Sequence, residues 1–395
     1  MVATSAQHDL RARGAGRAAL VYHEDYLKYA FSSGHALREV RVKLARDLIE
    51  EMGLLRAADE RKPPPASDAD LLTVHDRAYV SVVKRLSKDP RVPEPDFGLE
   101  PGDNPPFPGM YEAALLQVGG TLLACDLVVR NEVERAYNLG GGFHHAMRAR
   151  ASGFCIFNDV AIGIQKLLAD GMRRVLYVDI DGHHGDGVQA AFARDSHVLT
   201  ISLHEDGHFL FPGSGFVDEM GEGEGKGYSV NVPLPPHTRD EAWIRAFDAV
   251  VLPLAASFRP DVLVTQTGAD AHTGDPLTHL DLTTEAYEHA GVRFDEISRA
   301  HCGGRWIAVG GGGYDVTVVP RVWTLLFAAQ VGKRPGNALP EEWLRDCRRL
   351  ARAEPRDGTL RDAPIRSDAG RVTQAVEKVL ADVRAQIFPI HGIRD

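Results

Sequence analysis

One short stretch of the chain, YVDIDGHHGDG at residues 177–187, gathers acidic and histidine side chains directly after a run of strand-forming residues. Asp181 and His183 stand two positions apart, so in an extended segment both side chains project to the same side. Carboxylate and imidazole groups that converge in this way are suitable ligands for a borderline divalent metal ion. The spacing indicates metal chemistry, although an isolated motif of this kind is also compatible with a solvated turn.

Three other predicted strands also end in glycines and in side chains able to do chemistry. The segments that follow them are NLGGGFHH at 138–145, TGADAH at 267–272 and GGGGY at 310–314. In a parallel sheet, ligands bind outside the carboxyl ends of the strands, so we expect these segments to meet. Asp270 would then join Asp181 and His183 as a third ligand, which leaves an open position as in catalytic zinc sites.

The remaining polar residues suggest acid–base catalysis beside that metal. His144 and His145 are adjacent, and Asp179 and Asp186 are each able to accept a hydrogen bond from one imidazole. Such pairs would set the tautomer and the pKa of a general base and a general acid. From the residues alone, two alternatives stay open: the histidines could be metal ligands themselves, or surface residues. Tyr314 would offer its hydroxyl to an anion on the substrate, the alternative being a core tyrosine.

The elements that must position these residues alternate between strands and helices. Hydrophobic runs predict strands at 19–23, 136–139, 175–178, 198–203, 262–267 and 306–309. Amphipathic patterns predict helices within 34–53, 158–171, 240–257, 283–300, 317–330, 340–352 and 371–386. Asn158 is a predicted N-cap, and Gly53 and Gly171 are predicted helix ends. This alternation predicts an α/β fold with a parallel sheet covered by helices on both faces.

The chain of 395 residues is expected to fold as one domain, because no internal repeat and no flexible linker divides it. Residues 1–17 are predicted to be a disordered tail, and 18–395 a single domain whose C-terminal part, 335–395, is helical. The proline-rich stretch 89–109 and the Gly- and Glu-rich stretch 204–227 are predicted to be long loops.

Composition argues against several classes of protein. The net charge of −10 disfavours a general nucleic-acid binder, which usually presents a basic face. The four cysteines are scattered without CxxC spacing, so neither a disulfide framework nor a cysteine-type zinc site is predicted. No uninterrupted apolar run reaches about 18 residues, and the N-terminus lacks the apolar core of a secretory signal. We therefore predict a soluble cytoplasmic protein without direct nucleic-acid or membrane partners.

Taken together, the motifs resemble those of the histone deacetylase family, most of all its bacterial members, which include the acetoin-utilisation deacetylases. The matching segments lie between residues 19 and 330 in the family's order and spacing: NLGGGFHHA, ASGFCIFND, VLYVDIDGHHGDGVQAAF, VLTISLH, FPGSG, GYSVNVPLP and VGGGGY. The resemblance implies the single-domain arginase/deacetylase fold, an α/β fold with a central parallel sheet of about eight strands and helices on both faces.

Position by position, the resemblance implies the following roles. One zinc ion per chain would be bound by Asp181, His183 and Asp270. The catalytic residues would be His144, His145 and Tyr314, with Asp179 behind the first histidine and Asp186 behind the second. One or two structural potassium ions are implied, an inner one at Asp179, Asp181, His183, Ser202 and Leu203, and an outer one at Phe192, Asp195, Val198 and Tyr228.

The resemblance also implies a substrate tunnel. Its matching positions are Gly153, Phe154 and Phe211 in the walls, Leu277 at a further wall position, and Asp103 at the rim. Without the resemblance, ordinary core packing would be the preferred interpretation of the two phenylalanines. The family's GHP motif is GHA at 34–36, and Asp315 stands where relatives often have histidine. Neither departure touches the predicted chemistry.

The implied reaction is zinc-dependent hydrolysis of acyl-lysine amides in a protein or peptide, with an acetylated metabolic enzyme such as an acyl-CoA synthetase favoured over a histone as substrate. An acetylpolyamine amidohydrolase is the nearest alternative, but its entrance should carry a carboxylate where this chain has Leu277. A binuclear manganese ureohydrolase needs an Asp-x-Asp-x-x-Asp pattern, whereas residues 268–272 read GADAH. A non-catalytic scaffold that binds acyl-lysine is disfavoured because all the catalytic positions are filled.

Overall fold

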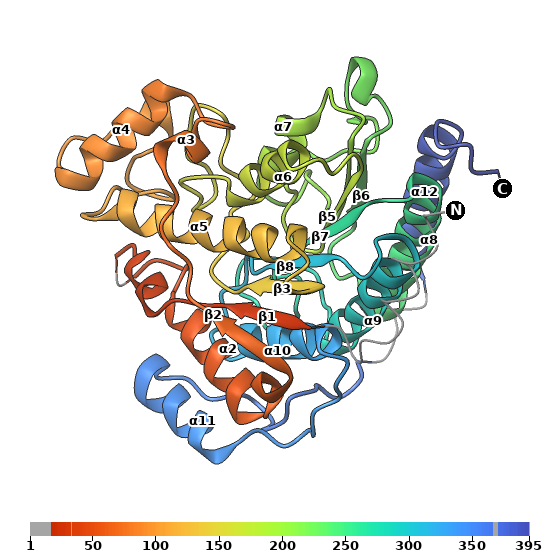
Figure 1. Ribbon diagram of the computed structural model, residues 1–395. Coiled ribbons are helices and arrows are strands. Elements are labelled where there is room, and N and C mark those ends of the chain that lie inside the picture. The colour runs from red at the N-terminus through yellow and green to blue at the C-terminus, as the bar shows by residue number, and fades with distance from the viewer. Residues whose placement is uncertain (1–16, 33, 366–369, 395) are drawn as a thin grey trace, which may run out of the picture.

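The computed structural model describes residues 17–32, 34–365 and 370–394. Its centre is one sheet of eight strands, all parallel, in the order β2-β1-β3-β8-β7-β4-β5-β6 (Figure 1). The strands are β1 (Ala18–Val21), β2 (Ala58–Arg61), β3 (Arg135–Asn138), β4 (Val175–Asp179), β5 (Val198–Glu205), β6 (Ser229–Leu234), β7 (Val262–Gln266) and β8 (Trp306–Val309). This confirms the predicted α/β fold with its parallel sheet of about eight strands.

Helices cover both faces of the sheet (Figure 1). One layer contains α2 (Val40–Glu51), α8 (Asp240–Phe258), α9 (Thr284–His301), α10 (Val318–Gln330) and α12 (Arg371–Ile387). The other layer contains α5 (Met110–Val129), α6 (Asp159–Ala169) and α7 (Asp186–Phe192), with α3 (Asp68–Leu71) and α4 (Arg77–Lys88) outside them, while α11 (Glu341–Asp346) packs on α2.

The central strands are buried on both sides because each face of the sheet meets its own layer of helices. In β4, Val175 and Tyr177 pack in the cluster beneath α5 and α6, whereas Leu176 and Val178 pack in the cluster beneath α8 and α9. This alternation follows from the two-residue period of a strand. It explains why β4 is a continuous apolar run up to the point where its polar end begins.

The six strands predicted from hydrophobic runs are all present, and the two that were not predicted lie at the edges of the sheet. β2 has the sequence ADER and is mostly half-buried, so it lacks an apolar run. β6 contains Pro233, which an edge position tolerates because one side of the strand needs no ladder bonds. β2 therefore lacks a strand signal. β6 carries one, since polar residues alternate with the buried Val230, Val232 and Leu234, and only its proline counts against a strand.

Helix α5 was also not predicted, because most of its residues on every side are buried and no amphipathic stripe exists. It is one helix in the described part of the chain that is long and apolar enough to cross a membrane by length and composition. Two thirds of its most apolar window (67%) is buried inside the protein, as is usual for a core helix.

Helix ends agree with the predicted caps, with one difference. The Asn158 side chain accepts a hydrogen bond from the Ala161 N–H (2.9 Å), and Gly53 follows α2 with a φ of 74°. α2 begins at Val40 rather than near residue 35, because the Leu37 N–H donates to the His35 ring and a turn replaces the first predicted helical turn.

The two predicted loops are largely irregular. Within 89–109 the one helical turn is Pro95–Phe97, and within 204–227 strand β5 continues to Glu205 before the loop begins. The predicted N-terminal tail lies outside the described residues except Arg17, which belongs to the domain: its carbonyl oxygen accepts a bond from the Glu134 N–H.

Candidate metal and catalytic site

The four predicted strand-end segments meet because β3, β8, β7 and β4 are neighbours in the sheet. Their carboxyl ends therefore lie side by side, as expected for a ligand site in a parallel sheet. The loops that leave them carry His144 and His145, Tyr314, Asp270, and Asp181 with His183, in the order of the strands. Residues that are up to about 170 positions apart in the chain thus reach one place.

The three predicted metal ligands form a compact buried set. Donor atoms of Asp181, His183 and Asp270 all lie within 4.8 Å of one another. The His183 Nδ1 is 2.9 Å from an Asp270 oxygen and 3.2 Å from an Asp181 oxygen. Burial together with the charge of Asp181 raises the pKa of Asp270 to about 6. Two buried carboxylates with one imidazole are a donor set that a divalent cation would neutralise, so these residues fit zinc.

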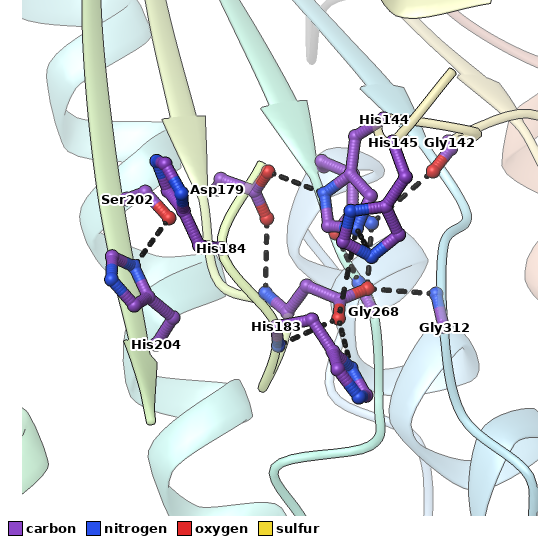
Figure 2. Close-up of polar contacts among 12 residues, drawn as sticks. Gly142, His144, His145, Asp179, His183, His184, Ser202, His204, Gly268 and Gly312 are labelled. Atoms are coloured by element: carbon purple, nitrogen blue, oxygen red, sulfur yellow. Dashed lines mark hydrogen bonds and ion pairs between the residues drawn. The ribbon is translucent and has the colours of Figure 1, made fainter. Parts of the chain in front are cut away.

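Glycines allow backbone to approach this set closely. A Cβ on Gly312 would lie 2.2 Å from an Asp270 oxygen, and one on Gly268 would lie 2.0 Å from an Asp181 oxygen. The Gly312 N–H instead donates to Asp181 (2.8 Å), and so does the Gln266 side chain (2.7 Å), as Figure 2 shows for Gly312. Gln266 was not predicted, since nothing but its place at a strand end marks it.

Two histidine–aspartate pairs lie beside the metal ligands, and Figure 2 shows the pair of His144 with Asp179. The His144 Nδ1 is 2.7 Å from Asp179, and the His145 Nδ1 is 2.7 Å from Asp186. The two Nε2 atoms are 3.0 Å apart. Asp179 is also held by the Tyr177 hydroxyl (2.5 Å), so its carboxylate has a fixed orientation. The structure thus brings together the predicted pairs in the predicted combination.

The two histidines differ in their protonation. Burial alone would lower the pKa of His144, but the charges of Asp179 and Asp181 raise it to about 9. Burial and the neighbouring charge of His144 lower the pKa of His145 to about 4. At neutral pH His145 is therefore the uncharged member: its Nδ1–H donates to Asp186, and its unprotonated Nε2 accepts the Nε2–H of the charged His144 at 3.0 Å.

Tyr314 lies over the metal ligands. Its ring packs edge-on at 6.4 Å from the His183 ring and at 5.6 Å from the Phe154 ring. Burial and the nearby carboxylates of Asp270 and Asp181 raise the pKa of the hydroxyl well above its ordinary value. The hydroxyl therefore keeps its proton and remains a hydrogen-bond donor.

A pocket opens onto these groups and is lined by two of the predicted wall residues, Gly153 and Phe154. Phe154 lies beside Tyr314, and the Phe211 ring lies 5.0 Å from the His145 ring and is 42% exposed. Gly153, at a φ of 50°, separates them: a Cβ there would lie 2.4 Å from His145 and 2.9 Å from Phe211. Phe154 therefore lines the pocket, whereas Phe211 is an exposed ring beside the pocket residue His145, and its role as a wall stays a prediction.

Two further predicted positions, Leu277 and Asp103, are not among the residues that line this pocket, and their roles stay predictions. Leu277 is half-buried and lies in the same loop as Asp270, between β7 and α9. Asp103 is exposed, and its carbonyl oxygen lies 3.2 Å from the His35 ring, which packs on Phe154. Arg41 was not predicted: it lines the pocket floor and donates to two carbonyl oxygens of the glycine loop.

The positions implied for potassium lie on the β4–β5 side of the site. Asp179 and Ser202 are partners in the ladder between β4 and β5, and the Ser202 hydroxyl lies 2.8 Å from the His204 ring. Leu203 follows Ser202 in β5. The outer set occupies the connection from α7 to β5 and the start of β6, at Phe192, Asp195, Val198 and Tyr228. Potassium binding at these positions stays a prediction.

His184, for which the sequence suggested no role, contacts the loop that follows Phe211. Its ring nitrogens lie 2.9 Å from the Ser214 hydroxyl and 3.1 Å from the Gln189 side chain. The ring packs 4.7 Å from that of His204, which bonds the Gly215 carbonyl oxygen (3.0 Å). Figure 2 shows both rings on the far side of Asp179 from His144. They anchor the segment that follows Phe211.

Comparisons with known proteins identify relatives of this chain. A model of the histone deacetylase domain matches residues 35–330. The chain is 44% identical over 327 residues to acetoin utilization protein AcuC of Bacillus subtilis, which covers 82% of this chain and 84% of that protein. It is 38% identical over 335 residues to AcuC of Staphylococcus aureus strain MSSA476, covering 84% and 86%. The crystal structure of an HDAC homolog from Aquifex aeolicus superposes with a TM-score of 0.83 at 31% identity, covering 93% of this chain and 100% of that one.

Proposed function

The chain belongs to the histone deacetylase family, and we propose that it is a zinc-dependent hydrolase of acyl-lysine amides in proteins or peptides. Membership itself identifies a hydrolase of the deacetylase type. The observation that carries the finer proposal is the buried set of Asp181, His183 and Asp270, whose donor atoms lie within 4.8 Å of one another beside two histidine–aspartate pairs.

Asp181, His183 and Asp270 would hold the zinc ion. When bound, zinc would supply Lewis-acid chemistry, polarising the acyl carbonyl and lowering the pKa of a water molecule to about 7. The protein's own contribution begins with exclusion of bulk water, since all three ligands are buried. Gln266 and the Gly312 N–H keep the second oxygen of Asp181 occupied, which leaves its other oxygen directed at His183.

Proton transfer is proposed to pass through His145. Its Nε2 exchanges the hydrogen bond from the His144 Nε2–H for one from the attacking water and takes a proton from that water, while the Nδ1–H remains bonded to Asp186. As the carbon–nitrogen bond breaks, a histidine returns a proton to the amine nitrogen, so water and amide become carboxylic acid and amine. His144, which stays positively charged through Asp179 and Asp181, stabilises negative charge in the site.

Tyr314 is proposed to donate its hydroxyl proton in a hydrogen bond to the oxyanion of the tetrahedral intermediate. The ring is held between Phe154 and His183, and the raised pKa keeps the hydroxyl protonated. A donor of this kind typically contributes about 10²–10³ in rate.

The proposed substrate is an acyl-lysine side chain, with Gly153, Phe154 and Phe211 around its apolar stem and Asp103 at the rim. Leu277 at the wall is apolar, which favours a peptide over a cationic polyamine. We further propose a metabolic enzyme as the physiological target, a cytoplasmic location, and one or two structural potassium ions at the positions named above.

The test compares rates on an acetyl-lysine peptide with those on acetylated spermidine and putrescine, with and without a zinc chelator. We expect the peptide to be hydrolysed at least about tenfold faster, and the chelator to abolish turnover. Faster turnover of the polyamines would instead identify an acetylpolyamine amidohydrolase. No turnover of any acyl amide by the zinc-loaded protein would indicate a scaffold.

A further inference from the structure

The backbone before Tyr314, the proposed oxyanion donor, has unusually few steric restrictions on its conformation. Tyr314 follows four consecutive glycines, and two of them, Gly311 and Gly313, have φ values of 138° and 121°. Such a segment has many accessible conformations, and a hydroxyl displaced by about 1 Å would lose much of its catalytic effect. Something outside the glycine loop must therefore hold Tyr314 in place.

The peptide bond before Tyr314 is fixed from both sides. The Gly313 carbonyl oxygen accepts a hydrogen bond from the Arg41 guanidinium (2.9 Å), and the Tyr314 N–H donates to the Asp275 carboxylate (2.7 Å). A peptide unit is planar, so its rotation would break both bonds together. Arg41 also bonds the Gly311 carbonyl oxygen (2.7 Å), whereas the bond from Asp275 is directed at Tyr314 itself.

Asp275 is itself well anchored. Its second carboxylate oxygen accepts the Leu277 N–H (2.9 Å), and its own N–H donates to the His272 carbonyl oxygen (2.8 Å). These bonds place the carboxylate within the loop after β7, which also carries Asp270. Asp275 thus links the loop with a metal ligand and a predicted wall residue to the loop with the oxyanion donor.

We infer that Asp275 is a positioning residue: it fixes the distance between the Tyr314 hydroxyl and the metal ligands by holding the Tyr314 N–H. This inference rests on the proposed function, in which Tyr314 is the oxyanion donor. It assigns Asp275 no contact with the substrate and no proton transfer. Its effect on turnover therefore passes through the Tyr314 hydroxyl alone.

The test is a double-mutant cycle with Asp275→Asn and Tyr314→Phe on an acetyl-lysine peptide. An amide offers only one acceptor oxygen, so one of the two N–H groups now bonded to the carboxylate loses its partner. With Tyr314 present, we expect kcat to fall about 10- to 100-fold at unchanged zinc content and nearly unchanged KM. In the Tyr314→Phe background, we expect the same change to alter kcat by less than about twofold.

Asp240→Asn is a matched control. The Asp240 carboxylate is buried and accepts the Thr283 N–H (2.8 Å) and hydroxyl (2.7 Å) at the other end of the same loop. We expect it to lower the melting temperature without a kcat loss that depends on Tyr314. If Asp275→Asn does not fold, Asp275→Ser, which retains an acceptor for the nearby Leu277 N–H, takes its place in the cycle.

The outcomes separate the two proposals. Equal losses from Asp275→Asn in both backgrounds, with an active wild type, would overturn the role of Asp275 alone. Loss of zinc from the Asp275→Asn protein would also overturn it, because the effect would then pass through Asp270. A wild type without turnover would overturn the proposed function and this inference with it.

Discussion

Replacing Asp186 by Asn removes the negative charge next to His145, the proposed general base. The hydrogen bonds that residue 186 accepts are retained. One carboxylate oxygen of Asp186 accepts both the His145 Nδ1–H (2.7 Å) and the Gly187 N–H (2.9 Å). A single amide oxygen is able to accept the same two bonds. The substitution therefore changes the basicity of His145 more than its orientation.

The size of the effect follows from the geometry. Two unit charges about 4 Å apart in a protein interact by about 4 kcal/mol at an effective dielectric constant of about 20. Loss of the Asp186 charge thus lowers the pKa of His145 by about 3. If about half of that basicity is expressed in the transition state, kcat falls about 30-fold. Asp186→Ala, which also frees the ring, should cost about 10²–10⁴.

The assay is steady-state hydrolysis of an acetyl-lysine peptide at saturating zinc, with zinc content measured for each variant. Asp261→Asn is the control: its carboxylate accepts the Arg173 and Arg174 N–H groups near the starts of β4 and β7, away from the site. Wild-type kcat for Asp186→Asn would refute the base assignment. Equal losses for Asp186→Asn and Asp261→Asn would refute it as well.

Three further predictions follow from other contacts. Tyr314→Phe should lower kcat about 10²–10³-fold with zinc affinity unchanged by titration calorimetry, and wild-type turnover would exclude Tyr314 as the oxyanion donor. His184→Phe, which loses the bonds to Ser214 and Gln189, should raise KM about 5-fold at similar kcat. A change in kcat alone would contradict the role of His184 in holding the loop that follows Phe211. Burial raises the pKa of Glu39 from 4.5 to about 7, and one of its oxygens has no hydrogen-bond partner, so folding weakens as pH rises through this window. Urea unfolding should therefore show Glu39→Gln about 1–3 kcal/mol more stable than wild type at pH 8 and equal to it at pH 4, whereas a pH-independent difference would contradict this.

The site residues that could be predicted are those that directly follow strands. A buried strand that stops in YVDIDGHHGDG marks its polar residues by contrast, and parallel topology brings such ends together. Arg41 and Asp275 carry no such mark, and Gln266 has only its place at the end of β7. Gln266 bonds Asp181, which is 85 positions away, and that contact depends on the order of strands in the sheet.

The helices and strands likewise separate into those that a sequence pattern marks and those that it does not. Strands in the centre of the sheet are apolar on both faces and can be recognised from composition. β2 at one edge has no apolar run, and α5 has apolar residues all around. β6 at the other edge alternates polar and apolar residues but contains Pro233, which counts against a strand. The start of α2 depends on a bond from the Leu37 N–H to the His35 ring, which no helix propensity reports.

The central claim is that one zinc ion, held by Asp181, His183 and Asp270, is required for amide hydrolysis. The most direct measurement is turnover of an acetyl-lysine peptide by metal-free protein as zinc is added in measured equivalents. We predict no turnover without metal and a plateau at about one equivalent per chain, with His183→Ala inactive throughout. Turnover by the metal-free protein, or a plateau that requires two metal ions per chain, would contradict this account.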